Sequence, residues 1–221
     1  MNVPVASAMR RFGRIFAAAW LVPAIAGCGG PQIYSTSQHQ AISLKKGELQ
    51  TGGVAFITPS TVTGQEEDKQ ALALAVGTVM AEHLAGVRCV PLAGTLGLVN
   101  RSGLAGDYKR MYDEYRDTGI FKRETLQQIG DITQTRYLVQ LKLASFSQSS
   151  KERFGFVGIR VLETRTSNIR LFLQIWDSKD GTVAWEGAEE LSFAFETSSE
   201  RNPTFRRVVE EAAHRIIANL P

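Results

Sequence analysis

The stretch that decides the fold is Leu171–Trp185, LFLQIWDSKDGTVAW, in which two apolar segments flank a turn. Before the turn, apolar residues recur at every second position, the period of a half-buried strand: Ile169, Leu171, Leu173 and Ile175. Residues 177–181, DSKDG, form the connection, and Gly181 supplies a residue suited to a positive φ. The return strand begins at Thr182 and continues, after an expected break at Gly187, toward Leu191, Phe193 and Phe195. This stretch predicts an antiparallel hairpin.

The residues upstream of the hairpin predict one more strand and two helices. The strand shows the same alternation, at Tyr137, Val139, Leu141 and Leu143. Helices are expected at 105–117 and 122–134, separated by Thr118 and Gly119. In the first helix the spacing favours core packing for Tyr108, Met111, Tyr112 and Tyr115. Residues 91–106, with four glycines, are expected to form an irregular loop with a short strand around Leu98 and Val99.

The two ends of the domain complete the pattern. A strand at 54–57 precedes a helix that Thr63 and Glu66 are expected to cap, and a second short strand follows at 87–90. Pro203 opens a final helix with one apolar face. The predicted order is β-α-β-α-α-β-β-β-α. We therefore expect a single α/β (α+β) domain over 51–221, a mixed sheet with packed helices and a C-terminal antiparallel meander.

Residues 1–27 read as a signal peptide. Arg10, Arg11 and Arg14 precede an apolar core at 15–25 that is too short to span a bilayer as a helix. The run LVPAIAGC at 21–28 is similar to the lipobox of bacterial lipoproteins. That resemblance implies cleavage between Gly27 and Cys28, and it implies that Cys28 carries diacylglycerol and an N-linked acyl chain such as palmitate.

The cellular location of the protein, its export signal and its start codon each have alternatives. Gly29 stands where an aspartate would retain a lipoprotein at the inner membrane, so the outer membrane is expected, with the domain facing the periplasm. A twin-arginine export signal is the rival interpretation of Arg10 and Arg11, although the residue usually found between the arginine pair and the phenylalanine is missing. Translation from Met9 would also give a compact signal.

Residues 28–50 are predicted to form a lipidated, flexible tether. They are rich in Gly, Gln, Ser and Thr and lack a hydrophobic period. Such a chain would reach roughly 25 Å as a coil and about 75 Å fully extended. Without the three arginines of the signal, 22 basic residues face 22 acidic ones. This balance gives no reason to expect nucleic acid as a partner.

The residues that carry chemistry are few. Cys89 would be the sole thiol once Cys28 is lipidated, so no intramolecular disulfide is expected, and it is interpreted as a core residue. His39, His83 and His214 have no metal-ligand spacing, and neither a nucleophile elbow nor a phosphate loop is present. We expect no enzyme activity, no metal and no cofactor apart from the covalent lipid.

Four residues are candidates for partner binding. Trp176 and Trp185 flank the turn and are expected to face the same side as a cross-strand pair, for packing first and binding second. Arg206 and Arg207 are expected on the solvent face of the last helix.

Two segments, 129–139 and 171–185, are similar to the shared second half of a superfamily of envelope lipoproteins. Its members include the curli secretion-channel lipoprotein, the lipoprotein activator of a penicillin-binding protein and the Pel polysaccharide-export lipoprotein. Their common domain resembles the amino-terminal domain of the Tol system's periplasmic propeller protein.

The resemblance implies a non-enzymatic assembly or secretion accessory that acts through contacts with envelope proteins and can form homo-oligomers. One alternative is an oligomeric export channel, with Phe154–Val161 as the membrane strand. Charged residues crowd the segment 146–168 and weaken that interpretation. The other alternative is a tethered activator of an envelope enzyme, for which the tether is short.

Overall fold

The computed structural model describes residues 32–156, 159–197 and 203–221. Its strands are β1 (Gln32–Ala41), β2 (Val54–Phe56), β3 (Ser60–Thr61), β4 (Cys89–Val90), β5 (Tyr137–Phe156), β6 (Ile159–Asp177) and β7 (Thr182–Thr197). Its helices are α1 (Glu48–Gly52), α2 (Glu66–His83), α3 (Leu92–Arg101), α4 (Ala105–Thr118), α5 (Arg123–Thr133) and α6 (Phe205–Ile217).

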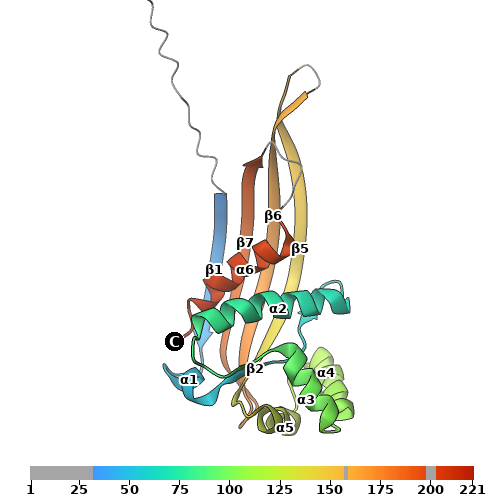
Figure 1. Ribbon diagram of the computed structural model, residues 1–221, viewed down its shortest axis with the longest axis vertical. Helices are drawn as coiled ribbons and strands as arrows, with labels where there is room; N and C mark the ends of the chain where they lie inside the picture. Colours follow the sequence, from blue (N-terminus) through green and yellow to red (C-terminus); the bar gives the residue numbers. More distant parts are fainter. Residues whose placement is uncertain (1–31, 157–158, 198–202) are drawn as a thin grey trace, which may run out of the picture.

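All seven strands form one mixed sheet in the order β1-β7-β6-β5-β2-β4, and β3 pairs with β5 beside β2 (Figure 1). The strands β5, β6 and β7 form the predicted antiparallel meander, and β2 and β4 run parallel. The predicted fold class, a single domain with a mixed sheet and packed helices, is confirmed. Both predicted helices between the sheet strands are present as α4 and α5.

Helices cover the two faces of the sheet unequally. On one face α2 and α6 pack side by side, and their apolar residues join the inward residues of the meander, among them Leu171, Leu173 and Trp185, in one core. On the other face α3, α4 and α5 enclose a second core that includes Leu138 and Trp176. Those three helices lie at one end of the sheet (Figure 1), which leaves the other end of the second face uncovered.

The described part of the predicted flexible tether, residues 32–50, is structured. Residues 32–41 form β1, which pairs with β7 from Gln32↔Ala194 to Ala41↔Trp185. Its side chains are exposed except for that of Ile33. A strand held by backbone hydrogen bonds, with hardly any buried side chain, carries no hydrophobic alternation. Beyond it, the backbone N–H groups of residues 42–44 donate to the carbonyl oxygen of Ala184.

Three further local predictions were wrong. Residues 92–101 form α3 instead of a loop, because Leu92, Thr95 and Val99 are buried on one side of it. The N-cap of α2 is Gln65 and not Thr63, since Gly64 adopts a φ of 71° and keeps Thr63 outside the helix. β7 passes through Gly187 without a break.

Candidate functional site

The position of Gln32, the first residue of β1, shows which end of the sheet is nearest in sequence to Cys28. Gln32 pairs with Ala194, Ala194 with Thr166 and Thr166 with Ser149, so these four residues form one row across β1, β7, β6 and β5. β5 and β6 continue beyond this row to their last pair, Phe156↔Ile159. The last pair of β5 and β6 therefore lies at the same end of the sheet as Gln32, the first described residue after the predicted anchor (Figure 1).

The uncovered part of the second sheet face forms a shallow surface, here called the amide face: Gln38, Gln40, Phe172, Gln174 and Glu186. A cavity of about 330 Å³ lies over β1, β7 and β6 and is lined in part by Gln38, Gln40 and Glu186. A smaller cavity of about 140 Å³ lies beside it over β5 and β6. The two cavities share Phe172 and Gln174, so they form neighbouring parts of one surface.

Two charged groups at the amide face, Glu186 and Arg170, contact neighbouring side chains. Gln174 Nε2 donates to Glu186 Oε2 over 3.2 Å. Arg170 Nη2 lies 2.7 Å from Glu190 Oε1, and its guanidinium stands 5.6 Å from the centre of the Phe172 ring. Carboxamides donate and accept hydrogen bonds but neither take up nor release protons near neutral pH. The carboxamides of the amide face are therefore suited to binding a partner through hydrogen bonds.

A second polar cluster lies at the opposite end of the sheet, beside the β6–β7 turn. Arg136 Nε and Nη2 donate to Asp177 Oδ2 over 2.8 and 2.6 Å, which raises the pKa of Arg136. The Tyr137 hydroxyl donates to Glu48 Oε2 over 3.2 Å. Burial, more than the neighbouring charges, raises the pKa of Tyr137 to about 12. These shifts hold Arg136 charged and Tyr137 neutral, and the contacts of the two residues join α1, β5 and the turn.

The tyrosines of α4 behave as predicted. Tyr108 and Met111 are buried, and Tyr112 and Tyr115 pack against the same core. The Tyr112 hydroxyl donates to the carbonyl oxygen of Thr58 over 2.8 Å, and Tyr108 accepts from the Thr58 N–H over 2.9 Å. Burial raises the pKa of Tyr112 well above its usual range. These tyrosines pack in the core, and the hydroxyls of Tyr108 and Tyr112 are hydrogen-bonded.

The structure corrects the prediction for Trp176 and Trp185. They lie in different cores on opposite faces of the sheet, and both are buried. The reason is a bulge: Ile175 pairs with Trp185 but Trp176 pairs with Val183, which leaves Ala184 unpaired and reverses the facing of Trp185. Neither indole is exposed to a partner.

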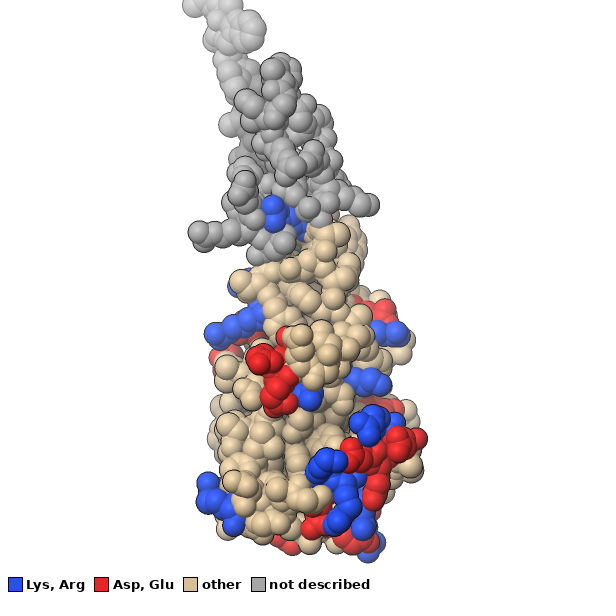
Figure 2. All heavy atoms as spheres, turned by 90° about the vertical axis from the view of Figure 1, so that its right-hand side faces the viewer, with Lys and Arg blue, Asp and Glu red and all other residues tan. Residues whose placement is uncertain are grey.

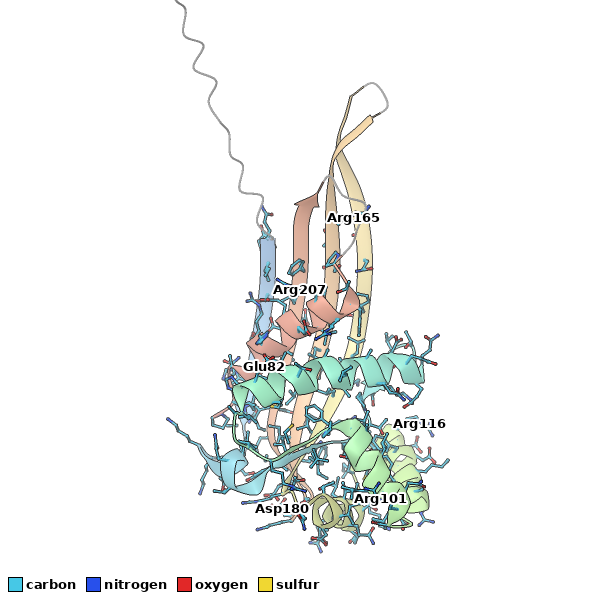
Figure 3. All side chains as sticks on the ribbon, viewed as in Figure 1. Glu82, Arg101, Arg116, Arg165, Asp180 and Arg207 are labelled. Carbon is cyan, nitrogen blue, oxygen red and sulfur yellow. The ribbon has the colours of Figure 1, made fainter. Side chains whose placement is uncertain are left out.

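The other predicted residues lie apart. Arg206 and Arg207 are exposed on α6, as expected, and Arg206 Nε lies 2.6 Å from Glu210 Oε1 (Figure 3 labels Arg207). Gly27 and Cys28 lie outside the described residues. Cys89 is half-buried in β4 beside the first core, and burial raises the pKa of its thiol. His39, His83 and His214 are exposed on three different elements.

Charged residues elsewhere are intermixed. Figure 2 shows acidic and basic side chains together over the lower end of the molecule, the end that carries α4. There Lys109 pairs with Asp113 over 2.6 Å and Arg110 with Asp107. Within 32–156, 159–197 and 203–221, no three His, Cys, Asp or Glu side chains are grouped to hold a metal. None of the helices in these ranges has the length and apolar content needed to cross a membrane.

Sequence reasoning missed the amide face. Its signal was present in the hairpin, where Phe172 and Gln174 occupy the positions that alternate with the buried Leu171, Leu173 and Ile175. Gln38 and Gln40 could not be added to it, because β1 was not recognised as a strand.

No family model matches the chain, and no curated protein sequence does. Among solved structures, a PelC dodecamer from Paraburkholderia phytofirmans is 10% identical, with 86% of this chain and 95% of that chain covered and a TM-score of 0.39. The lipoprotein GNA1162 from Neisseria meningitidis is 14% identical, with 75% and 97% covered and a TM-score of 0.44. At these TM-scores no conclusion about this chain follows from either structure.

Proposed function

We propose that this chain is a lipid-anchored, non-enzymatic protein of the bacterial outer membrane that faces the periplasm and serves as an assembly or secretion accessory by binding other envelope proteins. The observation that carries the proposal is the position of β1, which begins four residues after Cys28 of the lipobox. Four residues reach at most about 14 Å. An anchor on Cys28 would thus hold the folded sheet itself at the membrane surface.

The amide face supports binding as the activity. It combines exposed carboxamides on β1 with the half-buried Phe172 and Gln174 on β6, next to the Arg170–Glu190 ion pair. A partner that docks there would exchange water for hydrogen bonds to these carboxamides.

The short link argues against an activator that reaches far from its membrane. The predicted tether of residues 28–50 would have extended about 75 Å. With β1 formed, the described sheet begins at Gln32, four positions after Cys28. An accessory that works close to the membrane surface fits this geometry better.

Anchoring is tested by labelling cells with radioactive palmitate and separating their membranes. The wild-type protein should carry label and fractionate with the outer membrane, and Cys28→Ala should do neither. A Cys28→Ala protein that is still processed and membrane-bound would disprove the lipid anchor.

Binding through the amide face is tested with a photo-crosslinking amino acid at Gln38. The matched control is Leu74, which is 72% exposed on α2, on the other side of the sheet. We expect discrete crosslinked products from position 38 only, identified by mass spectrometry as a second copy or another envelope protein. Equal products from both positions, or none from position 38, would refute the role of this face. Light scattering of the lipidated protein in mild detergent separates a homo-oligomer from a monomeric adaptor.

A further inference from the structure

One edge of the sheet is formed by β1, which has a hydrogen-bonded neighbour among the described strands on one side only. β1 pairs with β7 through ten consecutive residues, and no bulge interrupts this register. Figure 1 shows β1 at the margin of the sheet, and α6 packs chiefly over β7 and β6. Nine of the ten side chains of β1 are exposed. The outer edge of β1 is therefore long, regular and accessible.

The backbone groups on this outer edge belong to the odd-numbered residues of β1. In an antiparallel ladder, the N–H and C=O groups of successive residues point to opposite sides. The N–H of Ile42, the residue after β1, donates to the carbonyl oxygen of Ala184. Because Ile42 and Ala184 continue the register of the last β1–β7 pair, the even-numbered residues bond to β7. The odd-numbered residues from 33 to 41 direct their N–H and C=O groups away from β7, where a further strand can bind them.

The sequence of β1 lacks the features that keep strand edges from pairing with another chain. Natural edge strands commonly carry lysine or another charge, a proline or a bulge. β1, QIYSTSQHQA, contains no Asp, Glu, Lys, Arg or Pro, although 21% of the residues of the whole chain are charged. Nothing in the composition of β1 therefore opposes the addition of a strand.

The side chains of β1 match a second copy of β1. A twofold axis normal to the sheet would pair two copies of the strand antiparallel, with each residue opposite a residue of the same strand. Six of the ten residues are Ser, Thr or Gln, whose hydroxyl and carboxamide groups both donate and accept hydrogen bonds. Such groups can pair with one another in any register. Since β1 has no acidic or strongly basic residue, no like charges would face each other.

We propose that the outer edge of β1 pairs with β1 of a second copy of this chain, so that two sheets join into one across a twofold axis near Thr36. An axis normal to the sheet keeps the two amide faces on the same side of the joined sheet. Gln38 and Gln40 of both copies then lie beside the shared edge. This inference goes beyond the proposed function and depends neither on the lipid anchor nor on a partner at the amide face.

The first test is the mass of the full, lipidated protein in mild detergent, measured by light scattering over a range of concentrations. Thr36→Lys brings two like charges together at the axis, whereas within one copy position 36 lies opposite Glu190 and accommodates a lysine. The matched control is Gln70→Lys, which adds the same charge at an exposed position of α2.

We expect a dimer for the wild-type protein and for Gln70→Lys, and a dissociation constant for the Thr36→Lys dimer that is higher by roughly tenfold or more. Thermal unfolding checks that both variants fold. A wild-type protein that stays monomeric at every concentration overturns the proposal. An assembly of any size that Thr36→Lys leaves as stable as the wild-type assembly also overturns it.

The second test uses two synthetic peptides with the sequence of residues 32–41. One peptide is N-methylated at its even-numbered residues and the other at its odd-numbered residues. Because the odd-numbered backbone groups would form the shared ladder, the even-methylated peptide should bind the protein in fluorescence anisotropy and dissociate the dimer. The odd-methylated peptide should do neither. Equal binding of the two peptides, or no binding of either, contradicts pairing through this edge.

The palmitate label on Cys28 separates this proposal from the proposed function. A protein that carries the label and fractionates with the outer membrane but stays monomeric loses the shared edge and retains its anchor. A protein that dimerises through β1 without carrying the label retains the shared edge and loses the anchor.

Discussion

Gly187 lies against the indole of Trp185, so that a Cβ atom at position 187 would stand 2.5 Å from Trp185 Cη2 and 3.1 Å from Ile216 Cγ1. The ring folds back along its own strand, and α6 covers it from the other side. Glycine at this position is therefore required by packing, and the strand continues through it.

Gly187→Ala should lower the free energy of unfolding by about 1–3 kcal/mol, because the buried ring has to move out of a well-packed core. Urea unfolding of the detergent-solubilised protein measures this. The matched control is Gly106→Ala in α4, where nothing lies within 4 Å of the added Cβ. That change should be neutral or stabilise by up to about 1 kcal/mol. Equal effects of the two substitutions would contradict the packing argument.

Asp177→Asn should destabilise the protein by about 1–3 kcal/mol, since Arg136 loses its charged acceptor while the Asp177 site stays buried. Glu210→Gln is the comparison, because Arg206 in that pair is 71% exposed. We expect a change within about 1 kcal/mol there. Thermal unfolding of both variants at the same salt concentration checks the difference.

The turn carboxylate Asp180 should titrate below its ordinary range. The Thr182 hydroxyl, with a smaller contribution from the Thr182 N–H, lowers its pKa. A lowered pKa in the folded state stabilises the fold above the unfolded value of about 3.9, and this contribution is lost as the pH falls through the folded pKa. Thr182→Val should shift the Asp180 pKa upward in an NMR titration. An unchanged pKa would show that the hydroxyl is not its partner.

Ser37→Ala should weaken the attachment of β1. The Ser37 hydroxyl donates to Glu189 Oε2, and Glu189 is completely buried. Its Oε1 has no hydrogen-bond partner in the part of the chain that the structure describes. Losing Ser37 should cost about 1–3 kcal/mol, whereas Ser37→Ala combined with Glu189→Met should recover much of it. Hydrogen exchange of the β1 amides reports the change, and a double variant less stable than Ser37→Ala would refute the pairing.

The strands and helices that could be predicted from the sequence are those with one buried face and one face in solvent. The alternation from Ile169 to Ile175 marks β6 because every second residue there is buried. β1 gives no such signal, since hardly any of its side chains is buried and polar residues fill both of its faces. The face of the sheet on which Trp185 lies could not be predicted, because the unpaired residue Ala184 shifts the alternation of faces along β7 by one residue. Nothing in the local sequence marks that bulge.

The residues of the candidate site could likewise be predicted from the sequence only in part. The exposed positions of Arg206 and Arg207 followed from the apolar stripe of α6, whose buried residues leave them on the outside. The amide face required two facts that only the three-dimensional arrangement supplies. One is that β1 continues the sheet, and the other is that α3, α4 and α5 stop short of its far end.

The direction of β1 also determines how the domain would bear mechanical load. β1 starts with Gln32 at the end of the sheet nearest in sequence to Cys28 and runs toward the opposite end. It lies antiparallel to β7 through ten consecutive residue pairs. A pull on the chain before Gln32 acts along the strand axis, so the whole ladder is sheared at once and its hydrogen bonds share the force. A strand entering from the opposite end would instead be peeled off one pair at a time. Under tension toward the membrane, the domain should therefore resist extraction as a unit.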